Sequence, residues 1–214
     1  MTTRPDGDTG AAAVPVGLWL SQGRLNDVNA WAAKSVVPVL VTRMGLHTAL
    51  VPRGRSAIGA PYDDAATLAA ARSAPKRLAP ALGFWVIDER AVITVQPAGW
   101  RRQVRWLVWD PSRGVLNPPG LAAASAAQVL SAARGGTRRD FDEMLAERHH
   151  PPERLLAALV GTLGLPGAEV LLDPASAEGW ARVQVHDPAA REVQYFEDSV
   201  RHAVALRREL GHEQ

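Results

Sequence analysis

Residues 105–115 read "RWLVWDPSRGV", and residues 182–193 read "RVQVHDPAAREV". Each phrase begins with an alternation of residue types that is typical of a β-strand and then reaches Asp-Pro. Asp accepts backbone hydrogen bonds at the first position of a turn, and Pro presets the dihedral angle at the second. Both phrases therefore predict a strand, a hairpin turn and a short return strand, the return strands lying at 114–117 and 191–198.

The two phrases belong to a longer internal match at an offset of about 77 residues. At this offset "PKRLAPALG" from residue 75 lies on "PERLLAALV" from residue 152, and "AVITVQP" from residue 91 lies on "AEVLLDP" from residue 168. The two Gly-Trp pairs of the chain also meet after a slip of about three residues. We interpret 61–136 and 137–214 as two copies of one unit.

Each copy predicts a helix, antiparallel strands and a second helix. The predicted helical segments are 63–82, 121–134, 141–163 and 199–211, and internal prolines split the first and third of them. The predicted strands are 84–88, 91–95, 104–109, 169–172 and 181–186. In the strand 104–109, Trp106 and Val108 share one face while Leu107 and Trp109 share the other.

The segment before the first copy predicts two further parts. Residues 1–13 have turn formers, small residues and no apolar period, which predicts a disordered tail. Residues 14–60 predict a strand, a helix and a strand pair around Met44-Gly45. The expected fold is therefore α+β: two tandem related helix–antiparallel-strands–helix units with an N-terminal extension, in one body. The alternatives are two independent domains, and an N-terminal segment that is a third, more divergent unit.

Composition narrows the functional classes. Of 214 residues, 47% are hydrophobic and 21% are charged, values that are usual for a globular protein. The absence of cysteine excludes disulfides and thiol chemistry, and the net charge of +2 does not indicate a global field for nucleic acid. The chain shows neither a signal-peptide pattern nor an apolar run of membrane-spanning length, so we expect a cytoplasmic protein with no membrane partner. Its Ala, Gly and Arg usage is typical of a GC-rich bacterium.

Catalytic motifs are incomplete wherever they begin. The Ser-x-x-Lys string at 73–76 lacks the downstream Ser-Asp-Asn and Lys-Thr-Gly strings of serine acylases. The stretch 54–59 misses the Gly-x-Ser-x-Gly spacing by one residue, and the Glu-x-x-His string at 147–150 has no second copy. We therefore predict no catalytic residue, no metal site and no cofactor, and we lean towards a protein that is not an enzyme.

The remaining signal is a cluster of arginine and tryptophan. Seven tryptophans are many for this length, and Trp and Arg anchor protein interfaces and also bind phosphates and stack on bases. The candidate binding residues are Trp100, Arg101, Arg102, Arg105, Trp109, Trp180, Arg182 and His186. The simpler interpretation places Trp106 in the core and leaves the arginines as a solvated edge.

Three functional hypotheses follow. The first is a non-catalytic protein-binding module, which is an adaptor, a regulator or a chaperone-like protein with a protein partner. The second is a nucleic-acid-binding protein that uses the Arg/Trp strand. The third is an enzyme or a small-molecule binder whose site lies between the two repeats.

Overall fold

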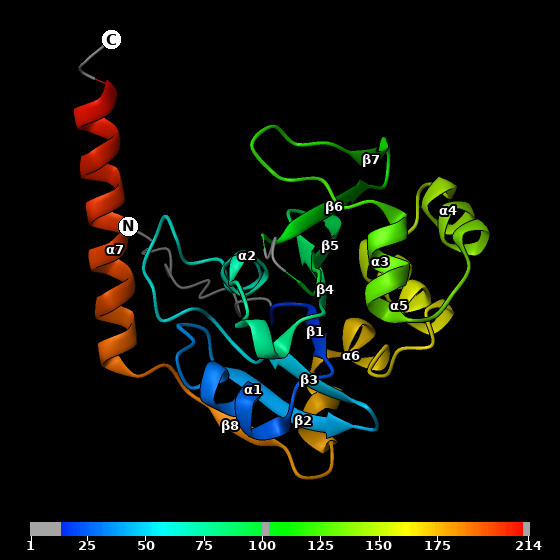
Figure 1. Ribbon diagram of the computed structural model, residues 1–214, viewed down its shortest axis with the longest axis horizontal. Coiled ribbons are helices and arrows are strands. Elements are labelled where there is room, and N and C mark those ends of the chain that lie inside the picture. Colours follow the sequence, from blue (N-terminus) through cyan, green and yellow to red (C-terminus); the bar gives the residue numbers. More distant parts are fainter. Residues whose placement is uncertain (1–13, 100–102, 212–214) are drawn as a thin grey trace, which may run out of the picture.

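A computed structural model describes residues 14–99 and 103–211, so the tail predicted at 1–13 lies outside the described residues. One antiparallel sheet runs through the protein in the order β7-β6-β5-β4-β1-β3-β2-β8 (Figure 1). The strands are β1 (Gly17–Ser21), β2 (Val39–Met44), β3 (His47–Pro52), β4 (Ala81–Ile87), β5 (Arg90–Gln96), β6 (Arg105–Asp110), β7 (Gly114–Leu116) and β8 (Gln184–His186). The sheet therefore joins strands from the N-terminal extension and from both predicted units.

Helices cover both faces of this sheet. The helices are α1 (Leu25–Ala32), α2 (Ala65–Ala71), η1 (Lys76–Leu78), α3 (Ala126–Ala133), α4 (Arg138–Ala146), α5 (Pro152–Thr162), α6 (Glu169–Leu172), η2 (Pro174–Gly179) and α7 (Ala190–Gly211). Helices α3 to α6 lie on one face, while α1, α2 and η1 lie on the other (Figure 1). These are the layers of an α+β protein, as the sequence predicts.

Two apolar cores result, because alternate side chains of each strand point to opposite faces. In β6, Leu107 and Trp109 join the core under α3 to α6, whereas Trp106 and Val108 join the core under α1 and α2. This is the alternation predicted for 104–109. A strand covered on both faces in this way has little side-chain surface left for a partner.

The predictions for the first 136 residues are largely confirmed. The N-terminal extension forms a strand, a helix and a hairpin around Met44-Gly45. The segment 63–82 contains α2 and η1 with a proline between them, but its last two residues are not helical, because they begin β4. The phrase at 105–115 forms the β6–β7 hairpin, in which Asp110 pairs with Gly114. Proline likewise splits 141–163 into α4 and α5.

Two strand predictions in the second unit are wrong. Residues 169–172 form helix α6, and residues 191–198 form the first turns of α7, so the phrase at 182–193 does not make a hairpin. A run of four apolar residues does not distinguish a strand from a buried helical turn, and here Val170 and Leu171 are buried by other elements. The second unit thus contributes the single strand β8 to the described sheet. The duplication of the sequence itself stays a prediction.

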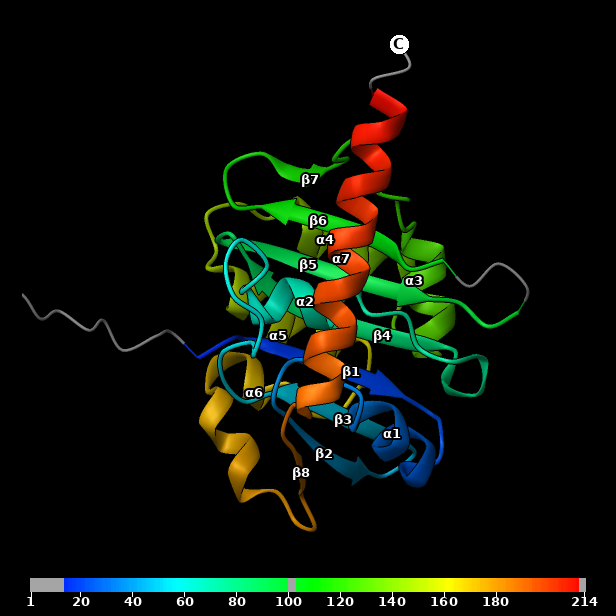
Figure 2. The same ribbon diagram turned by 90° about the vertical axis from the view of Figure 1, so that its left-hand side faces the viewer.

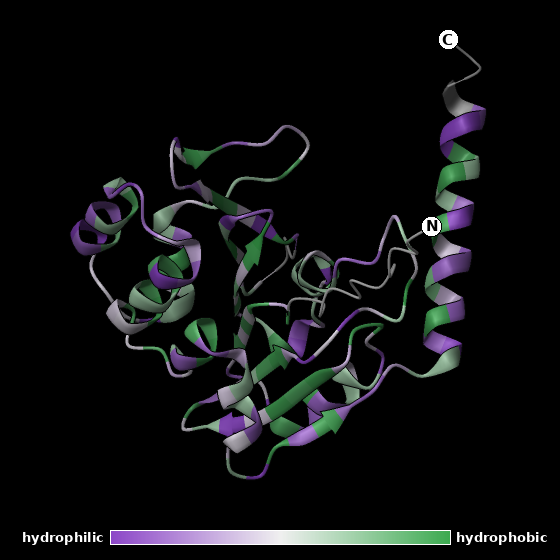
Figure 3. Ribbon diagram, turned by 180° about the vertical axis from the view of Figure 1, so that it is seen from behind, coloured by the Kyte–Doolittle hydropathy of each residue, from purple (hydrophilic) through white to green (hydrophobic). Residues whose placement is uncertain are grey.

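Helix α7 stands apart from the rest of the fold. In Figure 1, α7 lies on the same side of the sheet as α1 and α2 and is separated from the sheet. Figure 2 shows that α7 runs across this face of the sheet. Hydrophobic and hydrophilic residues alternate along its length (Figure 3). Among residues 190–209, whose burial is described, none belongs to the buried set of either core.

Candidate functional site

The tryptophan excess is mainly a feature of the two cores. Trp19, Trp31, Trp85 and Trp109 are buried, and only Trp106 and Trp180 of the remaining described tryptophans are partly open. Trp109 is fully buried, and its indole N–H donates a hydrogen bond to the carbonyl oxygen of Leu145 at 3.0 Å. The binding role predicted for Trp109 does not fit this position, because a partner has no access to its side chain.

The predicted Arg/Trp surface is not assembled on the described part of β6. Trp100, Arg101 and Arg102 lie outside the described residues. Arg105 is half-buried, and its guanidinium donates to the carbonyl oxygen of Ala123 at 3.2 Å. This arginine therefore ties β6 to the segment before α3.

The three predicted residues of the second unit lie near one another in sequence but have different surroundings. The Trp180 indole N–H donates to the Glu169 carboxylate at 3.0 Å. Arg182 is exposed and has a positive φ of 56°. His186 lies 2.9 Å from the Asn29 side-chain oxygen, and burial lowers its pKa although nearby Asp187 acts in the opposite direction. Of these three, Trp180 borders a hollow of the surface.

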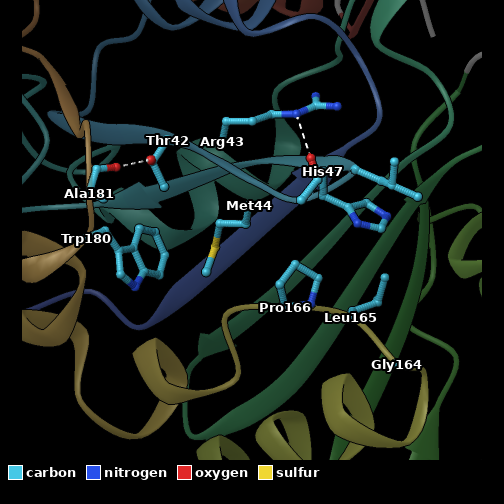
Figure 4. Close-up of a pocket in the computed structure, with 11 residues that line it drawn as sticks. Thr42, Arg43, Met44, His47, Gly164, Leu165, Pro166, Trp180 and Ala181 are labelled. Atoms are coloured by element: carbon cyan, nitrogen blue, oxygen red, sulfur yellow. Dashed lines mark hydrogen bonds between the residues drawn. The ribbon is translucent and has the colours of Figure 1, made fainter.

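That hollow lies between the β2–β3 hairpin and the loop after α5. Its volume is about 630 Å³. Figure 4 shows Met44 and His47 on the hairpin side, Leu165 and Pro166 on the loop, and Trp180 at one end. The Thr42 hydroxyl donates to the carbonyl oxygen of Ala181 at 2.8 Å and so joins the floor to the Trp180 wall. Its walls are mainly apolar, as in many small-molecule sites.

A second candidate surface is the seam beneath α7. An apolar groove of about 430 Å³ lies between α7 on one side and α2 with the segment after α1 on the other. Arg72 lies in this seam, where its guanidinium sits 4.2 Å from the centre of the Trp31 ring and donates to the Trp31 carbonyl oxygen. Burial lowers the pKa of Arg72 to about 10, while the nearby charge of Glu192 acts in the opposite direction.

Helix α7 is only lightly attached along this seam. Its partly covered side chains follow a helical spacing and include Val193, Phe196, Val200 and Val204. Among residues 190–209, every hydrogen bond and ion pair of a side chain stays within the helix itself. The attachment to the body is therefore mainly apolar, and the charges of Arg72 and Glu192 add an attraction across the seam without a hydrogen bond.

Two large apolar side chains of α7 are exposed. Tyr195 is 74% exposed although it also borders the groove under α7, and Leu206 is 48% exposed. Both side chains therefore leave apolar surface of α7 open to solvent.

Comparison with other proteins adds no assignment. No protein-family model, curated protein or solved structure matches the chain. The function must therefore be inferred from the residues and their geometry alone.

The described residues were also compared with the requirements of a metal site and of a membrane-spanning helix. Within 14–99 and 103–211, no three or more His, Cys, Asp or Glu side chains gather where they could hold a metal ion. In the same part of the chain, none of the helices combines the length and apolar character needed to cross a bilayer.

Sequence reasoning missed the residues that line these surfaces. His47 is an isolated histidine at the start of β3, and Tyr195 falls in a segment interpreted as a strand. Had 190–210 been interpreted as a helix, the spacing of Val193, Phe196 and Val200 would have indicated one apolar face and left Tyr195 on another. For His47 the sequence contains no comparable signal.

Proposed function

We propose that this protein is a non-catalytic protein-binding module, an adaptor, regulator or chaperone-like protein, and that α7 is its binding element. The observation that supports the proposal is the exposed apolar side chain of Tyr195, together with Leu206, on a helix whose side chains at 190–209 form no hydrogen bond to the body. An amphipathic helix of this kind binds by laying its apolar side into a groove of a partner.

Charge along α7 indicates what that groove offers. Between residues 201 and 209 the exposed charged side chains are Arg201, Arg207, Arg208 and Glu209, and Arg201 pairs with Asp198. The C-terminal half of the helix is therefore mainly basic. We expect a partner groove with an apolar floor and acidic residues along its rim.

The test is purification of the tagged chain from its host lysate after nuclease treatment and at moderate salt. We expect a stoichiometric protein partner that the double variant Tyr195→Ser/Leu206→Ser no longer retains. The matched control is Leu121→Ser/Leu172→Ser, which removes two exposed leucines elsewhere on the surface. A partner retained equally by both double variants, or no stoichiometric protein in any sample, would contradict the proposal.

A further inference from the structure

The hollow beside Trp180 continues into a second one, and the two share the tip of the β2–β3 hairpin. The second hollow has a volume of about 650 Å³ and lies between the C-terminal ends of α3 and α5. The residues common to both hollows are Arg43, Leu46, His47 and Gly164. We call the combined feature the hairpin cleft.

The helix ends meet closely at one side of the hairpin cleft. A Cβ atom at Gly135 would collide with the carbonyl oxygen of Leu163, so this approach of two backbones requires glycine. The preceding residue, Arg134, caps α3 in the left-handed region with a φ of 58° and is exposed. The close packing of glycine thus places an arginine side chain at the border of the cleft.

Positive charge in the hairpin cleft has no counter-charge among its lining residues. The two arginines Arg43 and Arg134 line it beside His47, and neither hollow is lined by a carboxylate. The Arg43 guanidinium is held by the Gly23 carbonyl oxygen and the Thr48 hydroxyl, each at 3.0 Å. Within the described chain, the guanidinium of Arg134 forms no hydrogen bond or ion pair, and neither does the imidazole of His47.

The pKa of His47 reflects the nearby positive charges of the two arginines. Its pKa is lowered, first by burial and then by the positive charges of Arg43 and Arg134. The imidazole is thus uncharged near neutral pH and can donate one hydrogen bond to an anion. The Glu169 carboxylate lies behind the Trp180 indole and accepts its N–H, so it does not neutralise the hairpin end of the cleft.

We propose that the hairpin cleft binds a small organic anion, with an apolar body on the wall formed by Trp180 and an anionic group beside His47 and Arg134. The wall formed by Met44, Leu165, Pro166 and Trp180 suits a flat or aliphatic body. Helix C-termini carry partial negative charge, so the anionic group belongs beside the side chains rather than against the ends of α3 and α5. This inference does not rest on the protein-binding role of α7.

The first test compares two probes of similar shape and different charge on the full chain. The anionic probe is 1-anilinonaphthalene-8-sulfonate, and the neutral probe is N-phenyl-1-naphthylamine. We expect the anionic probe to bind with one site per chain and with a dissociation constant at least about tenfold lower, the effect of a charge-assisted hydrogen bond. Equal affinity for the two probes would overturn the proposed preference for an anion.

The second test removes the two ends of the site separately. The double variant His47→Gln/Arg134→Gln is expected to weaken the anionic probe about tenfold and to change the neutral probe by less than about twofold. Trp180→Ala is expected to weaken both probes, because both need the apolar wall. The matched control, Arg113→Gln/His150→Gln, lies on exposed positions outside the cleft and should behave as the unmodified chain.

A third variant separates the cleft from the groove under α7, which also borders an arginine. Phe196→Ala alters that groove and leaves the hairpin cleft intact. Loss of the anionic probe in Phe196→Ala, with unchanged binding in His47→Gln/Arg134→Gln, would overturn the assignment. Circular dichroism of each variant checks that the helices and strands are retained.

Discussion

The phrases at 105–115 and 182–193 share an Asp-Pro step and yet build different structures. In the first, the Asp110 carboxylate accepts the backbone N–H groups of Ser112 and Arg113 at 3.0 and 3.1 Å, and Gly114 has a φ of 78°. In the second, Arg191 occupies the place equivalent to Gly114, and the chain continues directly into α7. Asp-Pro therefore leads into a hairpin turn only in the first phrase, where Gly114 takes the left-handed conformation that this turn requires.

The two phrases also differ in what lies around them. The strand of the first is covered by helices on one face and by η1, α2 and neighbouring side chains on the other, and its Trp109 is fully buried. The strand of the second is the edge strand β8, in which Val185 is 50% exposed. We therefore expect substitutions at equivalent positions of the two phrases to change the free energy of unfolding by different amounts.

The largest difference is expected at Trp109 and its counterpart His186. Trp109→Ala removes a buried indole and its hydrogen bond to Leu145, and we expect the free energy of unfolding to fall by about 3–5 kcal/mol. His186→Ala should lower it by less than about 1 kcal/mol, because His186 lies on an edge strand. Urea unfolding followed by circular dichroism measures both values, and equal losses would remove the distinction drawn here.

The next largest effect is expected at the turn. Gly114→Ala places a Cβ atom in the left-handed region and against the Arg148 guanidinium. We expect a loss of about 1–2 kcal/mol in the free energy of unfolding, since a non-glycine residue is strained at this φ. The control Gly59→Ala has open space around the new Cβ atom and should change the stability much less. A Gly114→Ala protein as stable as the unmodified chain would contradict the assigned role of the glycine.

One residue from each phrase, His186 and Asp110, should make the stability of the protein fall with pH, each in a different pH range. Burial lowers the pKa of His186 below its ordinary value of 6.5, so the unfolded chain binds this proton more readily and stability falls as the pH drops from 7 through the lowered folded pKa. The Ser112 hydrogen bonds lower the pKa of Asp110 below its ordinary value of 3.8, so its contribution is lost only at still lower pH.

Unfolding measured from pH 8 to pH 2 checks this separation. His186→Gln should flatten the part of the profile between pH 7 and the lowered pKa, and Asp110→Asn should change only the most acidic part. Since burial also lowers the pKa of His47, His47→Gln serves as the comparison variant in the upper range. An unchanged upper range in His186→Gln would show that this histidine titrates normally in the folded protein.

The smallest effect on stability is expected at Tyr195 and Leu206, the exposed apolar side chains of α7. Tyr195→Ser/Leu206→Ser changes two exposed side chains that no described residue holds by a hydrogen bond, and we expect the free energy of unfolding to change by less than about 0.5 kcal/mol. The same double variant is expected to abolish partner binding. A large loss of stability would instead show that these side chains pack within the fold.

Local chemistry made the first part of the chain predictable. The alternation in 104–109, the glycine at Gly45 and the prolines that split 63–82 act within a few residues, and each produced the expected element. The same reasoning failed at 169–172 and 191–198, where short apolar runs are compatible with a strand or a helix. There the choice followed from burial by distant segments and from the absence of a glycine after Asp187-Pro188.

The candidate sites were less accessible to sequence reasoning than the fold. Of the predicted binding residues, Trp180 borders the hairpin cleft, whereas Trp109 is in the core and Arg105 ties β6 to a neighbouring segment. The cleft instead joins His47 and Arg134, which are far apart in the sequence. No spacing rule connects them, because their proximity arises from the packing of the β2–β3 hairpin against the ends of α3 and α5.

The sequence by itself determined the α+β class, the alternation of β6 and the turn after Asp110, since these depend on side-chain period and on turn chemistry within a few residues. Only the tertiary structure decided which tryptophans are core, where α7 lies and how His47 and Arg134 meet. The physical reason is that burial and the proximity of charges depend on residues from distant segments. The local sequence of each segment does not specify which other segments will pack against it.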